Sequence, residues 1–235
     1  MKTLSIITKW VFIICLPFLL LTASLAVTVN SLWLYQYGFD KYDVSQRTGL
    51  SQEELGKAAR GLVSYFNSGE EYINLTVLKD GEPFQLFNQR EILHLKDVKG
   101  LIWLDYWVLL GTLVFMLAYA SVHLLYDRKR NWPSLLQSTA WGSGLTIALM
   151  LALGIGSLFG FDQIFYQFHL LSFANDLWQL DPKTDYLIML FPRGYFYDVT
   201  LFFSLAAIAW ATVLGGTTGG YLLFNRRHPT TRQND

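Results

Sequence analysis

Four apolar runs, each long enough to cross a lipid bilayer, constrain the fold of this chain more than any other feature. They cover residues 10–32, 106–126, 135–159 and 199–224. A helix rises 1.5 Å per residue, so about 20 apolar residues cross the roughly 30 Å hydrocarbon layer. The composition agrees, because 52% of the residues are hydrophobic and only 15% are charged, as is typical of membrane proteins. The pattern predicts a membrane α-helical fold with a four-transmembrane-helix bundle.

Basic residues predict how these helices are oriented. Segments 1–9, 127–134 and 225–235 together hold eight Lys and Arg residues and two acidic residues. Segments 33–105 and 160–198 hold ten basic and sixteen acidic residues. Because Lys and Arg near helix ends mark the cytoplasmic side, we expect a cytoplasmic N-tail, a basic cytoplasmic loop and a cytoplasmic C-tail. The two longer segments then face the extracytoplasmic side.

The first apolar run has a second interpretation, as a cleavable signal peptide. Lys2 and Lys9 precede it, and Ser24-Leu25-Ala26 has the small residues of a cleavage site. The run is longer than the roughly 7–15 residues of a signal core, so we expect a retained helix. Cys15, the single cysteine, lies within it and allows neither an internal disulfide nor a cysteine-based metal site.

Segment 33–105 has the signals of a small α+β domain. Ser51-Gln52-Glu53-Glu54 has the reciprocal pattern of a helix start, and apolar residues at helical spacing follow it up to a stop at Gly69. Alternation over residues 72–77 predicts a strand, and Asp80-Gly81 predicts the turn of a hairpin. Another helix is expected to start at Asn88 and to continue into the second span.

Two histidines, His94 and His169, lie in the segments expected on the outer side. Imidazole is the side chain best suited to moving protons near neutral pH. Arg90, His94 and Asp97 are four and three residues apart, so they share one face of the predicted helix. The same spacing is typical of a solvated amphipathic helix with incidental ion pairs, and the sequence leaves that alternative open.

Segment 160–198 is expected to be an aromatic outer loop between the third and fourth helices. Twelve Phe, Tyr and Trp residues fall within positions 159–197, and aromatic residues gather at membrane interfaces. That tendency does not explain the polar residues among them, because a polar group in an apolar setting is unfavourable unless paired. A mixed lining is also what a pocket for a lipid with a polar head needs. The polar residues are His169, Asn175, Asp176, Asp181 and Asp185.

Several familiar site classes lack support in the sequence. There is no Gly-x-Ser-x-Gly nucleophile turn, no His-Glu-x-x-His zinc helix and no Gly-rich phosphate loop. His123 lies in an apolar run with no second spanning histidine to complete a haem site, and His228 lies in the polar C-tail. A metal site joining His94, His169 and carboxylates is an open alternative, although no short-spaced ligand pair is present.

Both outer segments carry motifs that resemble one family. The first motif is Arg90-Glu91-Ile92-Leu93-His94-Leu95-Lys96-Asp97-Val98. The second runs from Phe168-His169 through Phe173-Ala174-Asn175-Asp176-Leu177-Trp178, Asp181-Pro182 and Asp185 to Phe191-Pro192 and Phe196. Together with the four spans, these motifs resemble the bacterial lipoprotein intramolecular transacylases. Arg193 departs from the pattern, in which an acidic residue is expected after Phe191-Pro192.

The resemblance implies an acyltransferase of the bacterial cytoplasmic membrane with its site on the extracytoplasmic side. It would move the sn-2 acyl chain of a diacylglyceryl lipoprotein onto the amine of the N-terminal cysteine, which yields a lyso-form lipoprotein. His94 and His169 would be the catalytic residues. The implied partners are the lipoprotein substrate and membrane lipids, without nucleic acid, and the resemblance implies neither a cofactor nor a metal.

The residues suit such a reaction. An α-amine with a pKa of roughly 8 is mostly protonated at neutral pH, so we expect one histidine to deprotonate it and the other to protonate the leaving glycerol oxygen. Asp97 and Asp176 are expected to orient the rings by accepting an imidazole N–H. Arg90 or a protonated imidazole is expected to stabilise the developing oxyanion. The residues expected to bind or orient the substrate are Arg90, Glu91, Asp97, Asn175, Asp176, Trp178 and Asp185.

A function of another class is also compatible with the sequence. The capped helix, the hairpin and the aromatic loop suit a non-enzymatic membrane sensor or accessory subunit that binds a partner through its outer loops.

Overall fold

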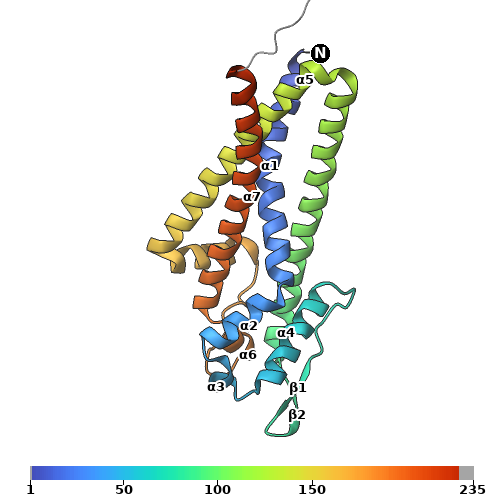
Figure 1. Cartoon of the computed structure of the whole chain (residues 1–235). Helices are drawn as coiled ribbons and strands as arrows, with labels where there is room; N and C mark the ends of the chain where they lie inside the picture. The colour runs from blue at the N-terminus through green and yellow to red at the C-terminus, as the bar shows by residue number, and fades with distance from the viewer. Residues whose placement is uncertain (1, 228–235) are drawn as a thin grey trace, which may run out of the picture. The chain divides into compact units, whose positions relative to one another are not determined.

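The computed structural model describes residues 2–227, and most of them are helical (Figure 1). Four helical segments are long and apolar enough to cross a membrane: Ile6–Asn30, Gln89–Tyr126, Asn131–Ser172 and Arg193–Arg226. The four predicted spans are thus confirmed as apolar helices, whereas His228 lies outside the described residues. The elements are α1 (Lys2–Asn30), α2 (Leu32–Lys41), α3 (Val44–Thr48), α4 (Gln52–Phe66), β1 (Thr76–Lys79), β2 (Glu82–Gln85), α5 (Gln89–Ser172), α6 (Tyr186–Leu190) and α7 (Arg193–Arg227).

The chain folds into two compact units, of which the first comprises the residues up to Ser24, Tyr106–Gly154 and the residues from Phe203 onward. Its core is built from apolar side chains of α1, the middle of α5 and α7. Gly142 permits close packing, because a Cβ built there would lie 2.8 Å from Cδ2 of Leu16. The buried core residues are Phe12, Leu16, Leu20, Met116, Tyr119, Leu135 and Ala211.

The second unit comprises Leu25–Asp105 and Ile155–Phe202. The predicted helix start at Ser51 is confirmed, because the Ser51 side chain accepts a hydrogen bond from Glu54 N. The hairpin is confirmed as well: β1 and β2 pair antiparallel, and Asp80 and Gly81 have φ values of 54° and 84°, as a tight two-residue hairpin turn requires. The helix ends at Phe66, earlier than the predicted stop at Gly69, and β1 is shorter than the predicted strand.

The start of α5 is confirmed at Asn88. The Asn88 side chain accepts from Glu91 N, and the Glu91 carboxylate accepts from Asn88 N, which together form a capping box. The helix is then assigned over 84 residues, so segment 127–134, expected as a loop, has a helical backbone even though the chain turns back there (Figure 1). Pro133, the helix breaker of this segment, lies inside the assigned helix α5.

The boundaries of the second outer segment also require correction. Residues 160–172 continue α5 as helix, and α7 already begins at Arg193, so the irregular part is confined to residues 173–192 and contains the short helix α6. Residues 160–172 include no proline, and Phe161, Phe165 and His169 recur every four residues, a spacing that places them on one helical face. His169 therefore lies on a helix and not in a loop.

Candidate active site

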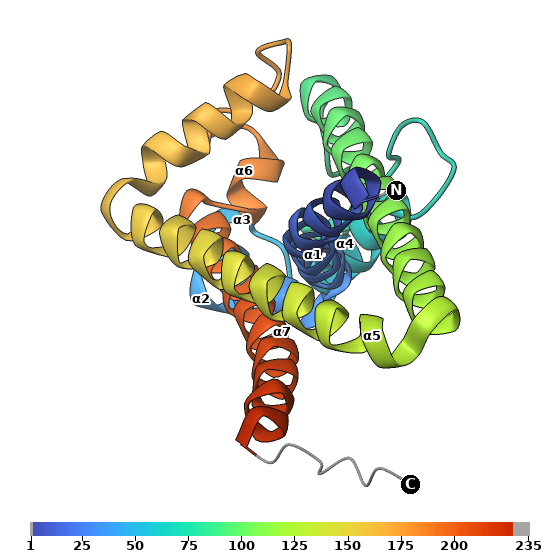
Figure 2. The same cartoon turned by 90° about the horizontal axis from the view of Figure 1, so that it is seen from above.

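The two outer histidines come together within the second unit. His94 lies in the second turn of α5 and His169 in its last turn, and the end of this helix returns toward its beginning (Figure 2). The ring centroids are 6.4 Å apart, with 30° between the ring planes. Both residues are buried, with exposed fractions of 6% and 8%. Their contact, which the sequence did not establish, makes this pair the centre of the candidate site.

Aromatic rings surround the pair. Phe165 and Trp178 lie with their ring centroids 4.3 Å and 4.9 Å from that of His169. Phe173 lies 5.0 Å from His94 in an edge-on arrangement. Burial among apolar groups disfavours the charged form of an imidazole. Both rings are therefore expected to be neutral before substrate binds, which is the state that a proton acceptor requires.

A backbone contact sets the tautomer of His169. Its Nδ1 lies 2.7 Å from the carbonyl oxygen of Phe165. A carbonyl can only accept a hydrogen bond, so Nδ1 carries the proton and Nε2 retains a lone pair. His94 differs, because its Nδ1 is buried and has no hydrogen-bond partner in the described part of the chain. The neutral His169 ring thus has its unprotonated nitrogen at Nε2, and His94 has a buried nitrogen without a partner among the described residues.

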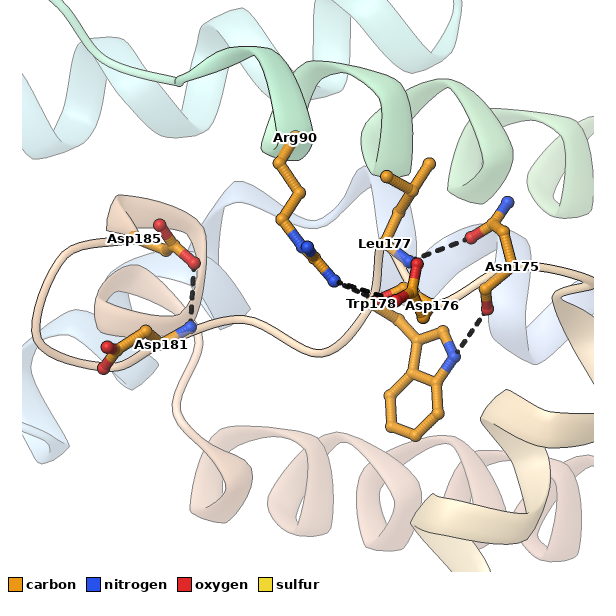
Figure 3. A network of polar contacts seen from close by, with 7 residues as sticks. All are labelled: Arg90, Asn175, Asp176, Leu177, Trp178, Asp181 and Asp185. Carbon is orange, nitrogen blue, oxygen red and sulfur yellow. Dashed lines mark hydrogen bonds and ion pairs between the residues drawn. The ribbon is translucent and has the colours of Figure 1, made fainter.

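The segment 174–178 is held against the first turns of α5 by two polar contacts, and Figure 3 draws the one made by Arg90. Arg90 donates from Nη2 to the carbonyl oxygen of Asp176, and its guanidinium lies 3.9 Å from the Asp176 carboxylate. Asn175 donates to Asp97 at 2.9 Å, and its carbonyl oxygen accepts from Trp178 Nε1 at 3.0 Å. These contacts fix the indole ring beside His169.

The carboxylates therefore differ from their expected role. Asp97 and Asp176 were predicted to accept an imidazole N–H, yet within residues 2–227 their hydrogen bonds and ion pairs go to Asn175 and Arg90. The physical reason is that the His169 N–H already has a partner one helical turn away, the Phe165 carbonyl. Asp97 and Asp176 position the segment that carries Trp178 and do not orient the rings directly.

Glu91 and Asp185 form a second, buried network. Glu91 is 1% exposed and accepts from Asn88 N at 2.7 Å and from Leu187 N at 2.6 Å. Asp185 accepts from Asn88 Nδ2 at 2.9 Å. It also accepts from Asp181 N at 2.8 Å (Figure 3). Both carboxylates thus join the start of α5 to the segment around α6.

Two ion pairs fix the start of α7. Arg193, which replaces the expected acidic residue, lies 2.8 Å from Asp162 near the end of α5. Asp198 lies 2.7 Å from Lys41 and accepts a hydrogen bond from the Tyr42 hydroxyl at 2.8 Å. Burial, followed by this contact with Asp198, raises the pKa of Tyr42 to about 12. Arg193 thus has a structural partner, and the site does not depend on an acid at its position.

Sequence reasoning missed three members of the site: Asn88, Phe165 and Phe173. Asn88 both caps α5 and binds Asp185, and only its capping role was evident locally. Phe165 precedes His169 by four residues, so its carbonyl contact follows directly once this segment is helical. A metal centre has no set of ligands here: no three His, Cys, Asp or Glu side chains of the described residues lie close enough together to hold an ion.

Comparison with known proteins identifies the family. The family model "Lipoprotein intramolecular transacylase Lit" matches residues 10–196, which include both histidines and every residue of the two polar networks. The chain belongs to this family. It is accordingly a membrane-integral protein of a lipoprotein acyltransferase family, and the expectation drawn from the two motifs is confirmed at that level.

Solved Lit structures have the same fold. The structure of Lit from Bacillus cereus, solved in meso, superposes with a TM-score of 0.80 at 21% identity and covers 97% of this chain and 99% of that chain. A variant of the same enzyme with one histidine replaced by arginine gives a TM-score of 0.76 at 20% identity, over 97% of this chain and 96% of the other. An uncharacterized protein of Aquifex aeolicus (strain VF5) is 25% identical over 207 residues, which are 87% of this chain and 89% of that protein.

Proposed function

We propose that this protein moves the sn-2 acyl chain of a diacylglyceryl lipoprotein onto the amine of the lipoprotein's N-terminal cysteine. The observation that carries the proposal is the pair of buried imidazoles, 6.4 Å apart and enclosed by aromatic rings. The substrate supplies its own nucleophile, the amine, so the protein needs only proton transfer, positioning and charge stabilisation. Aromatic walls suit the acyl and glyceryl groups of such a lipid.

The proton balance of the reaction assigns a task to each ring. The ammonium group loses two protons as it becomes an amide nitrogen, and the glycerol oxygen gains one. In the proposed sequence, His94 takes the first proton from the ammonium, and the free amine then attacks the ester carbonyl carbon. His169 accepts the second proton at Nε2, while the Nδ1–H···O=C contact with Phe165 stabilises its charged form.

The tetrahedral intermediate then collapses, with the C–N bond formed and the bond from the carbonyl carbon to the glycerol oxygen broken. His94 returns its proton to this leaving oxygen, and His169 releases the other proton to solvent. Because amine and ester belong to one molecule, holding them in contact supplies a large part of the rate enhancement. The rigid attachment of residues 174–178 to α5 supports such a positioning role.

The distribution of basic residues supports a site on the extracytoplasmic side, with both termini in the cytoplasm. In a bacterial cytoplasmic membrane this is the face on which a lipoprotein with a free N-terminal amine would meet the site. We propose membrane lipids and the lipoprotein as the partners of the second unit.

The test uses a bacterium whose lipoproteins retain a free N-terminal amine. Expression of the wild-type chain is expected to convert them to the N-acyl lyso form, detected by mass spectrometry of N-terminal lipopeptides. His94→Ala and His169→Ala should abolish the conversion. His123→Ala is the matched control, because this ring lies in the first unit and contacts the carbonyl of Tyr119. Normal conversion by both site variants would exclude the two-histidine mechanism.

A further inference from the structure

A buried polar atom without a hydrogen-bond partner can pair with a substrate group that reaches it. Such atoms are rare in folded proteins, because each one loses hydrogen bonds to water and gains none. In the described part of the chain, two of them are nitrogens on adjacent turns of α5: Nε of Arg90 and Nδ1 of His94. The others are an Asp105 carboxylate oxygen and the hydroxyls of Ser143, Ser157 and Ser204. Arg90 and His94 lie four residues apart, on one helical face.

Arg90 is held in place by one end of its guanidinium. Nη2 donates to the carbonyl oxygen of Asp176, and the Asp176 carboxylate lies 3.9 Å away. An arginine carries five N–H donors in a rigid plane and remains charged at every physiological pH. With Nη2 fastened, the orientation of the plane is restricted, and the buried Nε–H is left as a pre-positioned donor beside His94.

We propose that the Nε–H of Arg90 donates a hydrogen bond to the ester carbonyl oxygen of the substrate and stabilises the oxyanion that forms when the amine attacks. This deepens the proposed function and rests on it. The negative charge appears on the carbonyl oxygen when the C–N bond forms and disappears when the bond to the glycerol oxygen breaks. A fixed cationic donor stabilises the charge most in that interval.

The attachment of the 174–178 segment to α5 fits this role of Arg90. The carbonyl of Asp176 orients the guanidinium from one side, and Trp178 of the same segment covers His169. One short segment therefore positions the proposed oxyanion donor and encloses the proposed base. The contact of Asn175 with Asp97 fixes the segment at a second point.

The test compares Arg90→Gln and Arg90→Lys with wild type in purified protein acting on a diacylglyceryl lipopeptide. Loss of one oxyanion donor is expected to lower kcat by about 100- to 1,000-fold, with KM changed much less. Lysine keeps the charge but has no Nε–H at this position, so Arg90→Lys should recover only part of the rate. Lys96→Gln is the matched control, because it makes the same charge change on α5 at an exposed pair with Glu71.

A second measurement separates donation from anchoring. A lipopeptide with a phosphonate in place of the sn-2 ester imitates the oxyanion, and its affinity relative to substrate should fall in both Arg90 variants. If Arg90 only anchored the 174–178 segment, its replacement would weaken the binding of phosphonate and substrate by the same factor. That result would overturn the proposal. If Arg90→Gln does not fold, the affinity of Arg90→Lys for the phosphonate relative to substrate tests the proposal on its own.

Failure of the broader function is recognisable separately. If wild type does not produce the N-acyl lyso lipopeptide, the acyl transfer itself is wrong. If wild type is active, the histidine variants are inactive and both Arg90 variants stay within about threefold of wild-type kcat, only the role of Arg90 is refuted, since the loss of an oxyanion donor is far larger.

Discussion

Replacing Glu91 by Gln is expected to destabilise the second unit, because both carboxylate oxygens of Glu91 accept hydrogen bonds from the backbone. One comes from Asn88 N at 2.7 Å and the other from Leu187 N at 2.6 Å. Glutamine has nearly the same shape, but only one of its two terminal atoms is an acceptor. Whichever way the amide is turned, one backbone N–H therefore faces an NH2 group. The side chain is 1% exposed, so water cannot replace the lost acceptor.

The magnitude follows from that single lost contact. A hydrogen bond to a charged group contributes about 1.5–3 kcal/mol. A chain of 150–250 residues shifts its unfolding midpoint by roughly 2–4 °C for each kcal/mol, so Glu91→Gln should lower the midpoint by roughly 3–12 °C. The assay is thermal unfolding of purified protein in detergent, with lipoprotein conversion measured in parallel. We expect conversion to fall, because the start of α5 that carries His94 loses either its backbone cap at Asn88 or its attachment to Leu187.

Glu54→Gln provides the control. Glu54 is also buried, with 8% exposure, but its backbone contact involves one oxygen, which accepts from Leu78 N at 2.8 Å. A glutamine can present its carbonyl oxygen to that N–H and retain the bond. Equal midpoint shifts in the two variants would show that the use of both oxygens is not what makes Glu91 sensitive.

Two further predictions concern packing and the attachment of residues 174–178. Gly38→Ala should destabilise the protein by about 1–3 kcal/mol, because its Cβ would overlap the buried Tyr195 ring. Gly100→Ala, with nothing within 4 Å of its Cβ, should be neutral or stabilising. A similar thermal shift for both variants would contradict the packing argument. Asn175→Asp should lower acyl transfer by placing two carboxylates together. Adding Asp97→Asn should restore it, since the exchanged pair can hydrogen-bond again. If mass spectrometry of lipoproteins finds no recovery in the double variant, the loss does not come from this contact.

Local features of the fold were predictable because their causes are local. The caps at Ser51 and Asn88 act on backbone N–H groups within the same turn, and Asp80-Gly81 satisfies a positive φ requirement within two residues. Apolar length alone identified the four spans. Each of these signals is complete within a short stretch of sequence, so no knowledge of distant contacts was needed.

The boundaries and the roles of the carboxylates were harder to predict. The aromatic richness of residues 160–172 indicated an interfacial loop, although Phe161, Phe165 and His169 already had helical spacing. Asp97 and Glu91 have the partners Asn175 and Leu187, which are distant in the sequence and cannot be assigned without the fold. The pairing of His94 with His169 is of the same kind: topology placed both on one side, but only the tertiary structure brings them into contact.

The attachment of Glu91 to Leu187 has a consequence for how the protein is made. The N-terminal half of a chain is synthesised first. Helix α5 can therefore start and form its cap before Leu187, the donor to the second carboxylate oxygen of Glu91, has been synthesised. Until that residue emerges, the Glu91 carboxylate has no second backbone donor. The proposed catalytic pair is therefore completed only late in synthesis, after the third apolar segment has been made. A nascent chain that has not yet reached residue 187 would possess His94 in a capped helix but no closed site around it.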